Sequence, residues 1–123
     1  DYIYVSGGNS FFLLQELKRT GADQLIIDQI NQGKLYIGES AGSIITSPDI
    51  AYISAMDSTK KAPLLTSTEG LNLVDFYTLP HATNEPFEEE AQEIIAAYGN
   101  KIKLKPISND QVIMVLGDTI RVS

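Results

Sequence analysis

Gly38-Glu39-Ser40-Ala41-Gly42 places a serine between two glycines, each two residues away, directly after the apolar run Leu35-Tyr36-Ile37. The next residues, Ser43-Ile44-Ile45-Thr46, favour a helix. A serine at such a sharp strand-to-helix turn is typical of a nucleophile elbow, in which the hydroxyl is presented for attack. Glycines are needed on both sides because larger side chains would collide in so tight a turn. The pattern makes Ser40 a candidate nucleophile; the alternative is an ordinary glycine-rich turn.

The segments before this turn alternate between strand and helix patterns. Tyr2-Ile3-Tyr4-Val5 predicts a buried strand, which Ser6-Gly7-Gly8-Asn9 closes as a tight loop. Apolar residues at helical spacing predict a helix that starts near Phe11 and stops at Gly21, and a second helix over Ala22–Asn31. Parallel neighbouring strands need a crossover of this length, so we expect a parallel α/β arrangement.

The second half of the chain contains weaker patterns. Residues 48–70 read as a long irregular excursion around a short strand at Ile50–Ile53. Further strands are predicted over residues 71–79, 101–105, 111–116 and 119–122, and Gly117-Asp118 favours a hairpin between the last two. A helix is predicted to open at Asn84-Glu85-Pro86 and to end before Gly99.

These elements predict a single α/β domain over residues 1–123. We expect three layers, a mainly parallel sheet with the elbow at its edge, and a C-terminal β-hairpin. The first residue already lies at the mouth of a buried-looking strand, so we expect a partial domain that lacks N-terminal strand-helix units. A sheet deprived of strands exposes apolar edges. We therefore expect it to pair in a homo-oligomer or with a missing N-terminal segment that completes the sheet.

Composition excludes several classes of function. The formal net charge of −7 argues against nucleic acid or an anionic membrane as a partner. The chain has no cysteine, which rules out disulfides, thiolate metal ligands and a cysteine nucleophile. With a single histidine as well, we expect no metal and no other cofactor. No signal peptide and no apolar stretch of about 20 residues is present, so the expected location is cytoplasmic.

Activation of a serine requires a base and a group that orients the base. The only histidine, His81, follows Pro80 at the end of a predicted strand, at the edge of the sheet where ligands bind in α/β folds. A lone histidine is otherwise often an unremarkable surface residue. The candidates for the orienting carboxylate are Asp57 and Asp110, with Asp49 and Asp75 as weaker options. Each aspartate also fits an ordinary turn.

The loop Ser6-Gly7-Gly8-Asn9 also follows a strand and precedes a helix. It can therefore supply a second backbone N–H to an oxyanion beside Ser40. A dinucleotide or phosphate loop is the competing interpretation, but the chain has neither G-x-G-x-x-G nor G-x-x-x-x-G-K-[ST].

Three motifs in this order resemble the peptidase E family of serine peptidases, which includes α-aspartyl dipeptidase and, more distantly, cyanophycinase. They are Val5-Ser6-Gly7-Gly8-Asn9-Ser10-Phe11, Gly38-Glu39-Ser40-Ala41-Gly42-Ser43 and Leu79-Pro80-His81-Ala82-Thr83-Asn84. The resemblance covers essentially the whole chain, which looks like the C-terminal portion of a family member.

The resemblance implies a role for each matching residue. Ser40 would be the nucleophile and His81 the general base and acid. The N–H groups of Gly8 and Ala41 would form the oxyanion hole, and Asn9 would lie near the substrate. For the acidic third residue the resemblance implies Asp57, with Asp110 as the alternative acid; Asn109, beside Asp110, falls nearest that second position.

The expected function is hydrolysis of short peptides by a serine dipeptidase or other exopeptidase, through an acyl-enzyme on Ser40. No arginine matches a pocket for an aspartate side chain, and Glu39 adds negative charge beside the site, so an acidic substrate is disfavoured. The alternatives are an inactive truncated remnant that serves as a partner-binding module, and an esterase or amidase that uses the same elbow.

Overall fold

The computed structural model describes residues 1–123. Its helices are α1 (Ser10–Thr20), α2 (Ala22–Asn31), α3 (Ala41–Ile44) and α4 (Glu88–Tyr98), with two short 3-10 helices, η1 (Ala51–Ala55) and η2 (Thr59–Lys61). Its strands are β1 (Tyr2–Val5), β2 (Leu35–Gly38), β3 (Tyr77–Leu79), β4 (Leu104–Pro106), β5 (Ile113–Leu116) and β6 (Thr119–Val122). No helix has both the length and the apolar character needed to cross a membrane.

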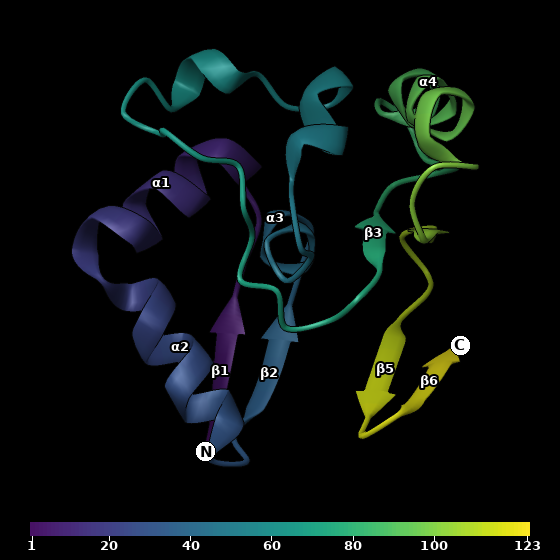
Figure 1. Ribbon diagram of the computed structural model, residues 1–123. Coiled ribbons are helices and arrows are strands. Elements are labelled where there is room, and N and C mark those ends of the chain that lie inside the picture. The colour runs from purple at the N-terminus through teal and green to yellow at the C-terminus, as the bar shows by residue number, and fades with distance from the viewer.

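Strands β1 and β2 run parallel, in register from Tyr2 opposite Leu35 to Val5 opposite Gly38. Helices α1 and α2 form the crossover between them and lie beside the two strands in Figure 1. The predicted β-α-α-β order is therefore confirmed. Because the strands are parallel, the residues that follow Val5 and Gly38 emerge at the same edge of the sheet.

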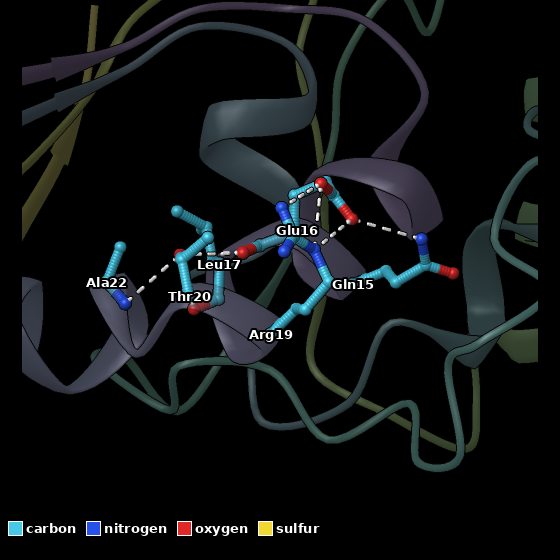
Figure 2. Close-up of polar contacts among 6 residues, drawn as sticks. All are labelled: Gln15, Glu16, Leu17, Arg19, Thr20 and Ala22. Atoms are coloured by element: carbon cyan, nitrogen blue, oxygen red, sulfur yellow. Dashed lines mark hydrogen bonds and ion pairs between the residues drawn. The ribbon is translucent and has the colours of Figure 1, made fainter.

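The junction between α1 and α2 is held by polar contacts in the last turn of α1 (Figure 2). Arg19 pairs with Glu16 at 2.8 Å, and its hydrogen bonds hold the pKa of the Glu16 carboxyl below its ordinary value. The Thr20 hydroxyl donates to the Glu16 carbonyl at 2.7 Å. Gly21 then adopts φ of +78°, a conformation that favours glycine and lets the second helix start at once.

The core gathers around the short helix α3, which contacts α1, β1, β2 and β3. The core contains apolar side chains from most parts of the chain. Those that are almost fully buried are Phe11, Leu14, Ile44, Ile45, Ile50, Ile53, Leu79, Ala91 and Ile94. The turn at residues 38–42 therefore lies directly beside the best-packed part of the molecule.

The chain forms three two-stranded sheets in place of the one mainly parallel sheet expected. β3 pairs with β4 in parallel, and β5 with β6 as an antiparallel hairpin, as predicted for the C-terminus. Residues 71–79 were expected to be one strand, but only Tyr77–Leu79 is. The N–H of Leu71 donates to Ile45 and that of Leu73 to Thr46, so this segment wraps the end of α3 and does not extend a sheet.

The strand expected at Ile50–Ile53 is wrong. This segment enters the 3-10 helix η1, and the Ile53 N–H donates to the Ile50 carbonyl at 3.1 Å. A spacing of three residues brings both isoleucines to the same side of a 3-10 turn, and both are fully buried. Burial of this pair outweighs the preference of β-branched residues for strands.

The last helix also begins later than expected, at Glu88. Asn84 does not cap this helix, because its side-chain oxygen accepts from the Asn109 N–H at 2.8 Å. The three glutamates 88–90 do occupy the first turn, where the helix dipole favours negative charge.

One face of β1–β2 carries exposed apolar side chains. Alternate residues of both strands point outward, with Tyr2 at 64%, Tyr4 at 54%, Leu35 at 61% and Ile37 at 42% exposure. The total accessible surface is 7399 Å², compared with about 6500 Å² for a compact chain of this mass. These four side chains form an exposed apolar face on β1–β2.

Candidate active site

Ser40 occupies a sharp turn between β2 and α3. Its backbone has φ of +54° and ψ of −113°, a combination that is costly for any residue with a side chain. The Glu39 N–H donates to the Val5 carbonyl at 2.9 Å and fixes the entry to the turn. The Gly42 N–H then donates to the Glu39 carbonyl at 2.9 Å and closes it.

The glycines around Ser40 are required by contact distances. A Cβ on Gly42 would lie 2.0 Å from the Val5 carbonyl oxygen, and a Cβ on Gly38 would lie 2.5 Å from the Gly42 oxygen. A Cβ on Gly7 would lie 3.3 Å from Ser40 Cβ, so the loop after β1 lies against the serine. The collisions predicted from the glycine spacing are therefore confirmed.

Tyr36 forms a hydrogen bond to the turn. Its hydroxyl donates to the Gly42 carbonyl at 2.6 Å, and burial raises the pKa of the phenol above its ordinary value. The raised pKa favours the protonated phenol, which is the form that donates this hydrogen bond.

We expect Tyr36→Phe to destabilise the chain by about 1–3 kcal/mol, because the partly buried Gly42 carbonyl loses its donor. Urea unfolding of the variant measures this loss. The matched control is Tyr2→Phe, which removes a hydroxyl from a side chain that is 64% exposed and should leave stability within about 0.5 kcal/mol. Equal stability of the two variants would contradict a supporting role for Tyr36.

His81 lies opposite Ser40. Its Nε2 is 3.0 Å from the Ser40 hydroxyl oxygen, although 41 residues separate them in the chain. The histidine follows β3 at φ of +60°, and its ring stacks on Phe87 with centroids 5.2 Å apart. The turn after β3 thus directs the imidazole toward the serine, and Phe87 limits its rotation.

The other ring nitrogen of His81 contacts Asn109. Nδ1 lies 2.6 Å from the side-chain oxygen of Asn109, whose N–H is held in turn by Asn84. The structure thus brings Ser40, His81 and Asn109 into one hydrogen-bonded row. The sequence signal for Asn109 was its place in the turn Ser108-Asn109-Asp110, but a carboxylate was sought there.

Neither aspartate favoured from the sequence contacts His81. The Asp57 carboxylate accepts from the Ser10 N–H at 2.8 Å and so caps the start of α1. Asp110 has an exposed side chain, and its N–H donates to the Ser108 hydroxyl. Asp57 therefore lies at a helix terminus, where its carboxylate pairs with an N–H that has no acceptor within the helix.

The remaining predicted residues lie at the same edge, in the loop after β1 and at the start of α3. Gly8 has φ of +129°, and its N–H donates to no acceptor within the chain. Ala41 begins α3, where the first N–H groups have no acceptor within the helix. Asn9 caps α1 by accepting from the Phe12 N–H at 3.0 Å, and its amide donates to the Ser58 carbonyl. Its side chain is therefore engaged in structure.

Ser40 and His81 are both half-buried at this edge of the sheet. Two cavities of about 260 Å³ each are lined by residues other than Ser40 and His81. No three histidine, aspartate or glutamate side chains come together in a way that could hold a metal ion.

The whole chain, residues 1–123, matches the family described as Peptidase family S51. The chain belongs to this family. The resemblance to peptidase E that the three motifs predicted is thereby confirmed, since proteins named peptidase E are also among the relatives of this S51 chain.

Relatives of this S51 chain are longer than it is. An uncharacterized peptidase of Listeria monocytogenes is 62% identical over 120 residues, which are 98% of this chain and 58% of the relative. One from Pasteurella multocida is 56% identical over 97% of this chain and 58% of its own length. Peptidase E of Streptomyces coelicolor is 36% identical over 66% of this chain and 32% of its own length.

A solved structure shares the fold. A crystal structure of a Listeria monocytogenes protein, named as a candidate peptidase E, matches all of this chain with a TM-score of 0.95 and 59% identity. The matched part is 59% of that protein. The S51 chain thus spans a little under three fifths of the length of the Listeria and Pasteurella relatives.

Proposed function

We propose that this chain carries the catalytic centre of a serine peptidase that hydrolyses short peptides through an acyl-enzyme on Ser40. The observation that supports it is the hydrogen-bonded row from Ser40 through His81 to Asn109, built on a strained nucleophile elbow. Membership of a peptidase family supports the same reaction class.

The contacts of His81 suit it to act as the base. When the Asn109 oxygen accepts a hydrogen bond from Nδ1, the ring proton is on Nδ1 and the lone pair of Nε2 faces Ser40. Nε2 removes the hydroxyl proton as the serine oxygen attacks the peptide carbonyl. It then gives that proton to the leaving amine, and the acyl-enzyme forms. A water molecule, activated by the same nitrogen, releases the acid and restores the serine.

The negative oxygen of the tetrahedral intermediate needs fixed donors. In this proposal, they are the N–H groups of Gly8, in the loop after β1 that lies against Ser40, and of Ala41, the first residue of α3. Both belong to the backbone, so they are held by the sheet edge and need no side chain. The positive φ of Gly8 is a conformation in which only glycine is unstrained.

The orienting group in this proposal is a neutral amide. Asn109 fixes the tautomer and the direction of the imidazole, but it provides no negative charge to stabilise the imidazolium that forms during attack. A Ser-His-Asn row is therefore expected to be catalytically competent and slower than the same row with a carboxylate.

An exopeptidase acting on short peptides is the substrate class that we propose, by similarity to relatives named peptidase E.

Reaction with an uncharged alkyl fluorophosphonate tests the proposal. The serine oxygen forms a bond to phosphorus as fluoride leaves, so one phosphonyl group is added and intact mass spectrometry detects it. We expect one adduct, located on Ser40 by peptide mapping, and none in Ser40→Ala. The matched control is Ser54→Ala, an exposed residue of η1, which should be labelled as the unchanged chain is. Absence of labelling, or labelling at another serine, would contradict an activated Ser40.

A further inference from the structure

Glu39 places a carboxylate next to the proposed nucleophile. It follows β2 directly, and its N–H is held by the Val5 carbonyl at 2.9 Å. Its side chain is exposed, as are those of Leu35 and Ile37, the alternate residues before it in β2. Because β1 and β2 are parallel, Glu39 emerges at the sheet edge at which Ser40 also lies.

The charge of this carboxylate reaches its surroundings. Tyr4 lies on the neighbouring strand and is 54% exposed, and the nearby negative charge of Glu39 raises the pKa of its phenol. Tyr4 lies opposite Ile37 in the β1–β2 register, and Glu39 follows Ile37 by two residues, so both side chains project from the same face as diagonal neighbours. A substrate bound at Ser40 would also lie close to the negative charge of Glu39, because Glu39 is the residue before Ser40.

No cation of the chain neutralises Glu39. The two ion pairs are Arg19 with Glu16 and Lys103 with Asp75, and both lie on other elements. Lys34, at the opposite end of β2, precedes the strand and does not reach its carboxyl edge. Lys60 and Lys61 lie in η2, after Ser58, whose carbonyl accepts from Asn9, and neither forms an ion pair with Glu39. The negative charge next to Ser40 is therefore available to a ligand.

We propose that Glu39 selects substrates that carry a positively charged nitrogen within one residue of the bond that is cut. This inference rests on the proposed function and adds the charge of the substrate to it. The cation is the free α-ammonium of the peptide or a basic side chain. Both are exposed ion-pair partners for the same carboxylate, and an acidic side chain at that position would be repelled.

Labelling with substrate-like diphenyl phosphonates distinguishes the two sources of charge. Ser40 displaces one phenoxide from phosphorus, a P–O bond to the serine replaces the P–O bond to phenol, and the serine proton leaves with the phenoxide. The probes carry lysine, norleucine or glutamate side chains, each with a free or an acetylated amine. We expect the lysine probe to react about three- to fivefold faster than norleucine and the glutamate probe to react more slowly, a range set by exposed ion pairs. If the α-ammonium is the cation, probes with a free amine should label Ser40 faster than the acetylated probes by a similar factor.

The decisive comparison uses Glu39→Gln, which keeps the size of the side chain and removes its charge. We expect the ratio of lysine to glutamate labelling to fall toward one in this variant, and in 1 M salt for the unchanged chain. The matched control is Glu93→Gln on α4, which alters the net charge equally and should keep the ratio. As a readout independent of labelling, the pKa of Tyr4, followed by NMR, should fall toward its ordinary value in Glu39→Gln.

The outcomes separate the two proposals. If the uncharged fluorophosphonate labels Ser40 equally in both chains but the charge ratio is unaffected by Glu39→Gln, the role of Glu39 is overturned and the proposed function stands. If neither the fluorophosphonate nor any phosphonate labels Ser40, the proposed function fails and the inference fails with it.

Discussion

Ser40→Ala is expected to lower the hydrolysis of short peptides by roughly 10⁴- to 10⁶-fold, which is the usual effect of removing a nucleophile from such a row. The variant loses the oxygen that attacks the carbonyl, while His81 and the backbone donors stay in place. Its fold should be unaffected, because the Ser40 hydroxyl contacts only His81 among side chains. Peptide turnover and circular dichroism of the purified variant measure both effects.

Ser40→Gly is the informative companion to this variant. Glycine also lacks the hydroxyl, so hydrolysis should be lost to the same extent. Glycine, however, adopts φ of +54° without strain, so we expect it to be more stable than Ser40→Ala by about 1 kcal/mol. Urea unfolding of the two variants tests this order. Turnover that survives in both would exclude Ser40 as the nucleophile, and equal stability would exclude backbone strain at the turn.

Asn109→Ala is expected to reduce kcat by roughly 10²- to 10³-fold with little change in KM. The Asn109 oxygen is the only acceptor for Nδ1 of His81, at 2.6 Å, so its loss frees the ring to take the wrong tautomer. Asn109→Asp should retain activity or exceed that of the unchanged chain, because a carboxylate orients the ring and also stabilises the imidazolium. Steady-state kinetics of the two variants test this contrast.

Asp57→Ala is the control that separates the two assignments of the third residue. In the structure Asp57 caps α1 through the Ser10 N–H, so we expect a loss of about 1–2 kcal/mol in stability and a nearly unchanged kcat. Asp110→Asn should alter neither quantity. A large loss of kcat in Asp57→Ala, together with an unaffected Asn109→Ala, would restore the assignment favoured from the sequence.

Much of the site could be predicted from local sequence because its requirements are local. The collisions that exclude side chains at Gly38 and Gly42 arise within one tight turn and leave a signature in adjacent residues. The crossover of two helices between β1 and β2 follows from apolar spacing and chain length. The position of His81 after a strand-ending proline follows from the same kind of pattern. Ser40 and His81 were therefore both identifiable before their 3.0 Å contact was known.

Other features depend on contacts between distant segments. Ile50 and Ile53 have strand propensity, but the core buries both on one side of a 3-10 turn. Residues 71–74 have the apolar character of a strand, but their N–H groups find acceptors at the end of α3. In each case the partner lies outside the segment, so no local pattern reveals it.

The third residue of the site shows the same division most clearly. The spacing of glycines and the single histidine specify a serine, a base and a sheet edge, because a strand-to-helix turn and the end of a strand are properties of a few consecutive residues. Which side chain contacts Nδ1 of His81 depends on two loops that are 28 residues apart in the chain. Asn84 holds the Asn109 backbone beside the imidazole, whereas Asp57 caps α1 through the Ser10 N–H. An aspartate is the usual partner of a catalytic histidine, which is why the sequence favoured Asp57. The N–H at the start of α1 competes for the same carboxylate, however, and only the tertiary structure shows that Asp57 binds this N–H.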